Sequence, residues 1–341
     1  MTMLHDVTDA KTTHRLPWHA ATYLRAQVLC DALSGASPDL GGFVRSPPES
    51  LRWSSRKWRI LEEILRFDAD IITLCEVDHY DDWVAPMLAT VGYRGCFVKK
   101  PASPTLQYGD LEDGCAILYR ADKVEVLNSH SLVYAIADTP GAPRKICNQV
   151  AIMALLRLKT DAEGAAGGDG ASGGYKHFVL ATTHLKADKS AEGEAVRAQQ
   201  ARQLLAEVGK FRDRAAAGLG LASAEALPVI VTGDMNATPH ASADYGALCY
   251  AELSTSALRL RSAYPLAGDD AFTTWKIRPC KDGSGGMRET RHTIDYVLYA
   301  GEGCEAVARV AMPTAQECGE SRVPSFMYPS DHFSLVVDFK I

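Results

Sequence analysis

Several apolar runs of this sequence begin or end with acidic, amide or imidazole side chains. A carboxylate within an apolar strand is costly to bury alone. The runs are DIITLCEVDHY, LPVIVTGDMNATPH, RHTIDYVLY and PSDHFSLVV, and the side chains are Glu76, Asp234, Asn236, Asp295, Asp331 and His332. Because catalytic groups tend to lie at strand ends and in the loops that follow, these side chains are the first candidates for a functional site.

Taken one at a time, most of these side chains also have a structural explanation. Asp234 in GDMN and Asp331 in PSDH can both be turn residues. Glu76 can begin a helix over VDHYDDW, because acids favour the first turn of a helix. Asp295 is harder to explain in this way, since Tyr296 continues the strand directly after it.

Taken together, the acids indicate a metal site. If the strand ends converge, two carboxylates about 4 Å apart repel each other by about 4 kcal/mol at an effective dielectric of about 20. A divalent cation removes that repulsion, and a set of carboxylate and amide oxygens favours Mg²⁺ or Mn²⁺ over zinc. Because phosphate oxygens complete the octahedral shell of Mg²⁺, the pattern indicates chemistry on a phosphoester.

The elements that must position these groups are mostly strands. Runs rich in Val, Ile and Leu recur along the whole chain, and we predict strands over residues 70–77, 92–98, 114–120, 123–129, 147–158, 177–185, 227–234, 293–299, 306–312 and 332–339. Helical periodicity is confined to RKWRILEEILRF and EAVRAQQARQLLAEV. Their predicted apolar faces are Trp58, Leu61, Ile64 and Leu65 in the first helix, and Ala201, Leu204, Leu205 and Val208 in the second.

Two stretches interrupt this pattern without marking a domain boundary. Residues 161–174, DAEGAAGGDGASGG, are rich in Gly and Ala, which predicts a mobile hairpin tip. Residues 212–226 are expected to connect a helix to the next strand. Since strands continue on both sides, we predict one domain over residues 19–341, with two packed sheets flanked by helices, after a disordered segment over residues 1–18.

Composition and charge limit the choice of partners and location. The chain has 341 residues and a net charge of −6, so an affinity for nucleic acid would need a local basic patch. Its nine cysteines are scattered without the spacing of a zinc site, which indicates a reducing compartment. The polar start resembles neither a signal peptide nor a transit peptide, and no run reaches about 18 apolar residues. We therefore expect a cytoplasmic protein without a membrane or protein partner, with a mitochondrial location left open.

A series of motifs resembles a known family. In chain order, LCEVDHY, DGCAILY, NQVAI, THLKA, GDMNATP, TTWKIR, RHTIDYVLY and PSFMYPSDHFSLV are similar to the nocturnin branch of the endonuclease/exonuclease/phosphatase superfamily. The similarity begins at about residue 51, continues to residue 341 and extends to the carbon-catabolite-repressor-type deadenylases. It implies a four-layer α/β/β/α sandwich with two mixed β-sheets, a Mg²⁺ (or Mn²⁺) cofactor and the hydrolysis of a phosphoester.

The resemblance implies that Glu76 is the main metal ligand and that Asp331 completes the acidic cluster. Asp234 and Asn236 are implied to position or activate the attacking water. His332 is implied to contact the scissile phosphate and to be oriented by Asp295, and the groups implied to hold phosphate oxygens are His184 of THLKA and Asn148 of NQVAI. These roles suit phosphoryl transfer, which needs in-line positioning and neutralisation of charge.

The chain departs from the family pattern at its first strand. The family has an asparagine that helps to hold the metal there, and this chain has Gln27 in RAQVLCDALSG. Glutamine keeps the amide but adds a methylene, and a misplacement of about 1 Å can lower a rate by roughly 10²-fold.

A second departure concerns a basic clamp that, by the resemblance, holds NADP(H). Its positions are implied to be Lys100, Lys186 and Arg278, whereas one arginine of the clamp is replaced here by Asp188. An acid at this place repels phosphate, and Lys189, the next residue, is a candidate substitute.

Three functions fit these observations. The first is a phosphatase that removes the 2′-phosphate of NADP(H) or a related nucleotide, and the second is a 3′-5′ exoribonuclease or poly(A)-specific deadenylase acting on RNA 3′ ends. The third is an inactive protein that binds nucleotide, motivated only by Gln27. We interpret Trp275 and Phe326 as core side chains rather than stacking platforms for a base.

Overall fold

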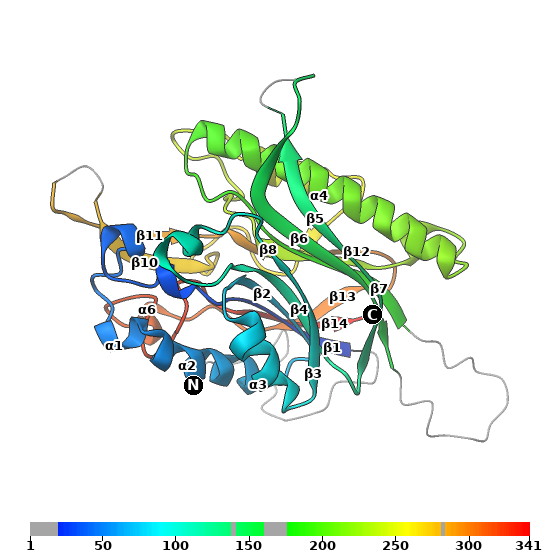
Figure 1. The fold of residues 1–341 in the computed structure, drawn as a ribbon. Coiled ribbons are helices and arrows are strands. Elements are labelled where there is room, and N and C mark those ends of the chain that lie inside the picture. The colour runs from blue at the N-terminus through cyan, green and yellow to red at the C-terminus, as the bar shows by residue number, and fades with distance from the viewer. Residues whose placement is uncertain (1–19, 138–140, 160–175, 281–283) are drawn as a thin grey trace.

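The computed structural model describes residues 20–137, 141–159, 176–280 and 284–341 (Figure 1). The predicted disordered segment over residues 1–18 and the predicted hairpin tip over residues 161–174 lie outside the described residues.

The first sheet has six strands in the order β13-β14-β1-β2-β4-β3. Their bounds are Glu305–Arg309, Leu335–Lys340, Ala20–Gln27, Ile71–Val77, Gly114–Arg120 and Tyr93–Lys99. Strands β1 and β2 run parallel, and the other neighbours run antiparallel, so the sheet is mixed.

The second sheet also has six strands, in the order β5-β6-β7-β8-β12-β9. Their bounds are Val124–Ile136, Lys145–Leu158, Lys176–His184, Val229–Asp234, Asp295–Ala300 and Arg261–Ser262. Strands β7 and β8 are parallel, and the remaining pairs are antiparallel. A separate antiparallel hairpin is formed by β10 (Thr274–Pro279) and β11 (Met287–His292).

The helices of the described residues lie between these strands in the chain. They are α1 (Pro48–Leu51), α2 (Trp53–Arg66), α3 (Ala85–Ala89), α4 (Ala191–Gly218), α5 (Leu248–Ser254) and α6 (Ala315–Cys318). Short helical turns occur at Asp31–Leu33, Pro38–Leu40, Tyr80–Val84, Pro104–Tyr108 and Ala224–Ala226. Although α4 has 28 residues, no helix within the described ranges combines the length and apolar character needed to cross a membrane.

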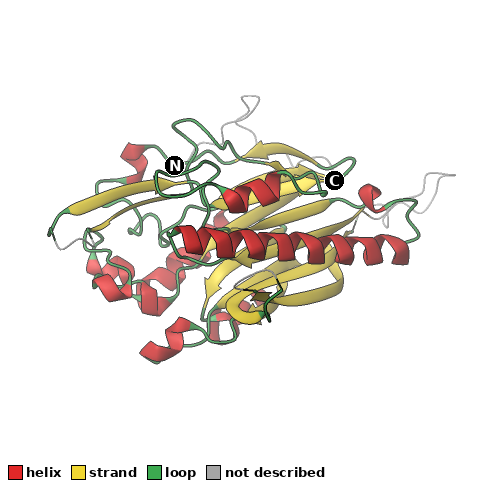
Figure 2. Ribbon diagram, turned by 90° about the horizontal axis from the view of Figure 1, so that it is seen from above, coloured by secondary structure: helices red, strands yellow, loops and turns green. Residues whose placement is uncertain are grey.

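Three apolar clusters show how the layers pack. One lies between the two sheets, a second joins the first sheet to α2 and α3, and a third joins the second sheet to α4 and α5. In Figure 1 the green helix α4 covers one sheet, and the blue and cyan helices α2 and α3 lie on the far side of the other. Seen from above in Figure 2, α4 runs along the strands beneath it. The expected α/β/β/α sandwich with two mixed sheets is confirmed.

All ten predicted strands are present, with ends shifted by a few residues. The last one begins at Leu335 instead of residue 332, so Asp331 and His332 lie in the loop before it. Periodicity did not identify β9, β10 or β11, and β1 was expected only from the resemblance. Strands β10 and β11 are rich in charged and polar residues, which hides the apolar signal of a strand.

The prediction of the buried face of α2 is partly wrong. Ile64 is buried, but Trp58 is 52% exposed and Leu65 is 38% exposed. The buried face instead contains Arg56, whose guanidinium donates to the carbonyls of Leu51, Val28 and Leu29. A fully bonded arginine can therefore occupy a core position that a hydrophobic pattern does not predict.

The prediction for α4 is better, although its end was misplaced. Ala201, Leu204 and Val208 are buried as expected, and Leu205 is half-buried. The helix continues to Gly218, so the first part of the predicted connection over residues 212–226 is helical. The run RDRAAAG explains the extension, because Arg and Ala are strong helix formers.

A polar contact crosses the apolar layer between the sheets. Tyr23 of β1 is fully buried, and its hydroxyl donates to Thr232 Oγ1 of β8 at 2.8 Å and contacts the hydroxyl of Thr73 of β2. Thr232 in turn donates to the carbonyl of Ala181 at 3.2 Å. This chain of hydroxyls fixes the position of one sheet over the other, because buried donors must keep their acceptors.

Replacing this tyrosine tests its contribution to stability. Tyr23→Phe removes the hydroxyl that serves two buried threonines, so we expect the free energy of unfolding to fall by about 1–2 kcal/mol. Chemical denaturation measures the change. Tyr108→Phe is the matched control, since its ring is exposed and its hydroxyl makes only a surface contact. Equal midpoints for the two variants would contradict the assigned role of Tyr23.

Candidate active site

The candidate side chains meet at one edge of the two packed sheets. Asp234, at the end of β8, is paired in register with His184 at the end of β7 and with Asp295 at the start of β12. Glu76 comes from the end of β2 in the other sheet, with His184 Nε2 lying 3.7 Å from its Oε1. The structure thus brings together groups that are far apart in the sequence.

The backbone at this edge is unusual. Glu76 has a φ of 54° at a bulge in the pairing of β2 with β4, and Asn236 has a φ of 50°. Gly233, with a φ of 143°, lies so close to Thr183 that a Cβ would stand 2.0 Å from its carbonyl oxygen. Strained backbone of this kind concentrates at functional sites, where it aims side chains that regular strands would point elsewhere.

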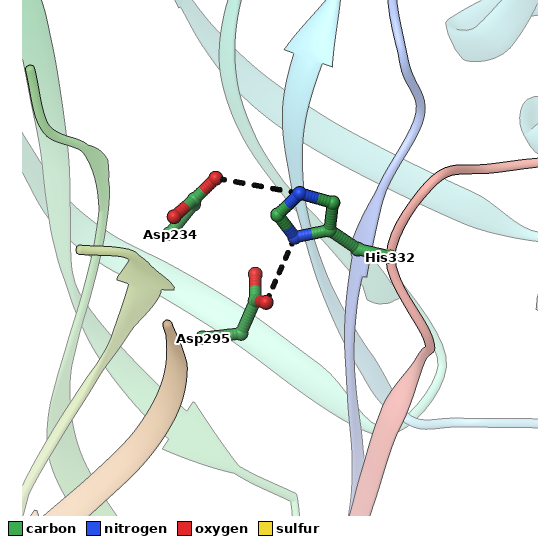
Figure 3. A group of neighbouring side chains, drawn as sticks. All are labelled: Asp234, Asp295 and His332. Atoms are coloured by element: carbon green, nitrogen blue, oxygen red, sulfur yellow. Dashed lines mark hydrogen bonds and ion pairs between the residues drawn. The ribbon is translucent and has the colours of Figure 1, made fainter. Parts of the chain in front are cut away.

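His332 is held by a buried acid. Its Nδ1 lies 2.8 Å from Oδ2 of Asp295, and its Nε2 lies 3.8 Å from Oδ2 of Asp234 (Figure 3). Asp295 also forms an ion pair with the fully buried guanidinium of Arg25. Burial alone would lower the pKa of His332, but Asp295, Asp331 and Asp234 together outweigh it and raise that pKa above its usual value. The histidine therefore has a fixed orientation and a tendency to carry charge.

Asp331 is paired with cations from β10. Lys276 Nζ contacts its carboxylate, and Arg278 Nη2 lies 3.4 Å from its Oδ2. Burial alone would raise the pKa of Asp331, but Lys276 and His332 hold it well below its usual range. Lys276 Nζ also lies 3.1 Å from His332 Nε2, which places a buried ammonium beside the imidazole.

Glu76 differs from Asp331 because its negative charge is poorly compensated. Burial and the nearby Asp331 raise the pKa of Glu76 to about 8, although Lys100 acts in the opposite direction. Lys100 is 8% exposed, and its Nζ lies 2.5 Å from Oδ2 of Asp113. The ammonium predicted for a substrate clamp is therefore buried beside Glu76 and already has a carboxylate partner.

Asp234 and His184 have environments that favour their neutral forms. Burial and Asp295 raise the pKa of Asp234, and His332 only partly offsets them. Burial, with Lys100 and His332, lowers the pKa of His184 well below its usual value. A carboxylate of raised pKa can accept a proton near neutral pH, which suits a general base.

The donor set fits a divalent cation. Glu76 Oε2 and Asp331 Oδ1 are buried without any hydrogen-bond partner, which is costly unless something else binds these oxygens. Asp234, Asp295 and His332 offer ligand atoms that all lie within 4.8 Å of one another. Carboxylate oxygens of this kind suit a hard cation such as Mg²⁺. Within the second group, however, Asp295 already binds both Arg25 and His332, so its carboxylate has less capacity to bind a cation.

Two of the predicted residues have contacts that do not match their expected roles. Gln27 is buried, but its amide oxygen accepts a hydrogen bond of 3.2 Å from Arg25, so it is not free for a metal. Asn148 uses its side-chain oxygen to accept a hydrogen bond from the backbone of Ala102 at 2.9 Å. Both roles stay predictions.

Asn236 lies next to Asp234. Its backbone N–H donates to Oδ1 of Asp234 at 2.8 Å, and its side-chain amide donates to the carbonyl of Leu185 at 3.1 Å. These bonds fix the asparagine over the end of β7, beside His184.

The clamp lysines divide into two kinds. Lys186 is exposed, and no described residue forms an ion pair with its ammonium. Lys189 is also exposed, but desolvation together with Lys276, Arg278 and Arg288 lowers its pKa to about 8, which indicates that these cations lie nearby. Asp188 is exposed, and its Oδ1 accepts a bond of 3.1 Å from the backbone of Ser190. The acid therefore caps a turn, and the role of Lys189 as its substitute in the clamp stays a prediction.

The interpretation of two aromatic residues as core is wrong for one of them. Trp275 is half-buried against Phe272, as expected for the edge of a core. Phe326 is 48% exposed, because a tight turn from Ser325 to Tyr328 carries it at its tip.

Sequence reasoning missed two cations that complete the site. Arg25 lies on β1 and Lys276 on β10, and both are buried. For Arg25 the sequence does contain a signal, which is the alternation of side chains along a strand. Tyr23, Arg25 and Gln27 occupy every second position of a buried strand, so their polar ends share one face.

Comparisons with known proteins identify the family of this chain. Residues 33–332 match the Endonuclease/Exonuclease/phosphatase family. Nocturnin from Rattus norvegicus is 34% identical over 341 residues, covering 98% of this chain and 69% of the relative. Nocturnin from Homo sapiens is 35% identical over 339 residues, covering 97% and 67%. CCR4-NOT transcription complex subunit 6-like-B from Xenopus laevis is 25% identical over 366 residues, covering 96% and 64%. The chain therefore belongs to the endonuclease/exonuclease/phosphatase family.

Within that family its sequence is similar to nocturnin. The solved human Nocturnin catalytic domain with bound sulfate anion superposes with a TM-score of 0.65 at 31% identity, covering 94% of both chains. ANGEL2, a 2′,3′-cyclic phosphatase, gives a TM-score of 0.69 at 20% identity, covering 94% of this chain and 95% of that one, which shows the fold alone. The expectations of the family and of a phosphoester-hydrolysing enzyme, rather than an inactive binding protein, are confirmed.

Removal of one carboxylate tests the metal site. Glu76→Gln should weaken the binding of Mn²⁺ by at least about 10²-fold, because it removes an anionic oxygen from a site that has few other unpaired carboxylate oxygens. Titration followed by the electron paramagnetic resonance of free Mn²⁺ measures this. Glu112→Gln is the control, since Glu112 pairs with Lys99 at the surface. Equal affinities for both variants would exclude Glu76 as a ligand.

The pH dependence of metal binding gives a second test. In the metal-free protein the pKa of Glu76 is about 8, so a cation that binds at lower pH must displace a proton. The affinity for Mn²⁺ should therefore rise by about tenfold per pH unit as the pH increases towards about 8, and then level off. Calorimetry across this range would detect the slope, and a flat profile would contradict the assigned environment.

Proposed function

We propose that this chain removes the 2′-phosphate of NADP(H) or of a related nucleotide in a Mg²⁺-dependent reaction. The proposal rests on one observation: carboxylates with buried, unpaired oxygens lie beside cations, and one of these carboxylates, Asp331, contacts both Lys276 and Arg278. The carboxylates would bind a divalent cation. That cation and the basic side chains beside it would together supply the positive charge that a phosphate monoester needs. Because the whole chain has a net charge of −6, this positive region is local and suits a small anion.

The choice of NADP(H) draws on the relatives. The chain is 34–35% identical to nocturnins over nearly its full length, and the sequence resemblance implies that branch's basic clamp for NADP(H). The solved human domain holds a sulfate, whose shape and charge resemble those of phosphate.

The metal would be held chiefly by Glu76 and Asp331, the two residues with unpaired buried oxygens. When bound, a divalent cation neutralises charge on the phosphate and supports the attack of water. Lys100 lies close enough to lower the pKa of Glu76, so its positive charge offsets part of the negative charge of the site.

The attacking water is positioned by Asp234 and Asn236. Asp234 has the raised pKa expected of a base that takes a proton from water, and the backbone of Asn236 binds its other oxygen at 2.8 Å. Water then forms a bond to phosphorus as the bond to the ribose 2′-oxygen breaks, and that oxygen takes up a proton. The products are orthophosphate and the dephosphorylated nucleotide.

His332 contacts the phosphate from the other side. Asp295 holds its Nδ1 at 2.8 Å, so its Nε2 is directed towards Asp234 and Lys276. An imidazole of raised pKa and a neighbouring ammonium donate hydrogen bonds to phosphate oxygens as negative charge develops there.

A 3′-end exoribonuclease is the second candidate. Its support is the similarity to deadenylase subunits, including the CCR4-Not complex 3′-5′-exoribonuclease subunit Ccr4 of Yarrowia lipolytica, which is 24% identical over 364 residues. The same carboxylates and His332 would then act on a phosphodiester.

Parallel assays separate the two candidates. With Mg²⁺ present, we expect NADP⁺ to release orthophosphate and form NAD⁺, as measured by a colorimetric phosphate assay and by chromatography. A 5′-labelled oligo(A) incubated under the same conditions reports exoribonuclease activity. Rapid shortening of oligo(A) without phosphate release from NADP⁺ would overturn the proposal.

A substitution tests the role of the histidine. His332→Asn should lower kcat by about 10²–10⁴-fold, because the donor to the phosphate is lost. His130→Asn is the matched control, since His130 is exposed on β5. Both variants are compared by thermal unfolding, and a kcat for His332→Asn close to that of the control would refute the assignment.

A further inference from the structure

A buried arginine of the first sheet reaches the second sheet at the active site. Arg25 lies on β1 and is completely buried, and its Nη1 forms an ion pair with Oδ1 of Asp295 at the start of β12. Because side chains alternate along a strand, Arg25 lies on the same side of β1 as Tyr23, whose hydroxyl donates to Thr232 of β8. The ion pair is therefore a second polar contact across the layer between the two sheets.

The other end of the guanidinium group is held by an amide. Nη2 of Arg25 donates to Oε1 of Gln27 at 3.2 Å, and Gln27 is the next residue on the same side of β1. The side chain of Gln27 is itself buried. Since two nitrogens of the planar guanidinium contact two different partners, the plane of the group is fixed.

Asp295 connects this arginine to His332. Its Oδ1 pairs with Arg25, whereas its Oδ2 accepts a hydrogen bond from Thr273 and lies 2.8 Å from Nδ1 of His332 (Figure 3). The carboxylate is bound on both oxygens, so it cannot rotate without breaking a contact on each side. Gln27, Arg25, Asp295 and His332 thus form a continuous series of polar contacts that ends at the imidazole.

Stability alone gives a poor account of a cation at this place. Nε of Arg25 is buried and has no hydrogen-bond partner within the described residues, and an unpaired buried donor is costly. Burying an ion pair also requires both charges to lose their hydration, and uncharged side chains of similar volume often stabilise a core as well or better. The contact with the carboxylate that binds His332 gives the arginine a role that core packing does not.

We propose that Arg25 is a positioning residue, which holds Asp295 in one orientation and thereby directs Nε2 of His332 towards the phosphate. Gln27 anchors the arginine in this arrangement. A misplacement of about 1 Å can lower a rate by roughly 10²-fold, so a residue that does not touch the substrate can still affect turnover. The inference rests on the proposed function for its substrate, although the same positioning serves any phosphoester that His332 contacts.

Arginine and lysine are not equivalent at this position. The guanidinium donates in fixed directions, so it can contact Asp295 and Gln27 at the same time. A lysine would keep the positive charge, but its single terminal nitrogen lies on a flexible stem. Arg25→Lys therefore tests the orientation of Asp295 separately from the charge, whereas Arg25→Met removes both.

A double-mutant cycle tests whether Arg25 acts through His332. In the full chain with Mg²⁺ and NADP⁺, Arg25→Met should lower kcat by about 10–100-fold with little change in KM, and Arg25→Lys by about tenfold. In the His332→Asn background, both substitutions should change kcat by less than about twofold, because the side chain that they position is absent. Full losses in that background would overturn the proposal.

Arg212→Met is the matched control. Arg212 is a buried arginine of α4, and its Nε donates to the carbonyl of Leu227, which precedes β8 at the end of that strand opposite Asp234. Its replacement should lower the midpoint of thermal unfolding and leave kcat unchanged. Because Arg25→Lys keeps a cation for Asp295, this variant decides the test if Arg25→Met does not fold.

The role of Gln27 is tested by metal binding. If Gln27 anchors the arginine, Gln27→Ala should lower kcat several-fold and leave the affinity for Mn²⁺ unchanged, as measured by electron paramagnetic resonance of the free ion. A loss of Mn²⁺ affinity like that expected for Glu76→Gln would assign the glutamine to the metal and overturn its role as the anchor of Arg25.

A spectroscopic measurement tests the positioning without turnover. In metal-free protein with ¹⁵N-labelled histidine at one fixed pH, the chemical shifts of the two ring nitrogens of His332 report the hydrogen bond at each nitrogen, and His332→Asn assigns them. Both Arg25 variants should change these shifts, and Arg212→Met should not. Shifts equal to those of the wild type would refute the proposal.

This measurement also separates failure of the positioning role from failure of the proposed function. If the wild type shortens oligo(A) and does not hydrolyse NADP⁺, the proposed function fails. The double-mutant cycle is then measured with oligo(A), and the ring-nitrogen shifts still decide whether Arg25 positions His332.

Discussion

The structure depends on one electrostatic constraint, which is the crowding of negative charge at a single sheet edge. Three buried carboxylates, Asp234, Asp295 and Asp331, lie there beside the partly buried Glu76. Repulsion among them would favour neutral acids unless cations are buried with them. The fold supplies three such cations, Arg25, Lys100 and Lys276, each from a different strand or strand end. These cations are distributed unevenly among the four carboxylates, and the pKa of each acid depends on how close a cation lies to it.

Two carboxylates are fully compensated and two are not. Asp295 and Asp331 have cation partners that hold their pKa values down, whereas the pKa values of Glu76 and Asp234 are raised. Asp295 binds the ring of His332, and Asp331 keeps its charge beside Lys276 with one oxygen, Oδ1, left without a partner, whereas Glu76 and Asp234 hold a proton more readily. One sheet edge therefore supports different roles for acids of the same kind, because their neighbours differ.

The sequence predicted the strands and the acidic residues because both leave a local signal. Apolar runs mark buried strands, and an acid inside such a run is conspicuous. The compensating cations Arg25 and Lys276 leave a weaker signal, since their carboxylate partners come close only in three dimensions. Phe326 was misjudged for the same reason, because a turn decides its exposure and its hydrophobicity does not. What could not be predicted was therefore the pairing of charges across strands.

The loop after β7 shows what this means for comparing relatives. By the resemblance, the family has a cation at the position of Asp188, and the side chain of Asp188 binds the backbone of Ser190. Lys189 lies among the basic residues of β10 and β11 instead. An alignment read column by column would record the loss of a positive charge, although a lysine follows one residue later, and its lowered pKa reports the basic residues of β10 and β11 nearby. A ligand responds to where a charge lies in space, so a comparison of relatives at this loop has to consider neighbouring positions together.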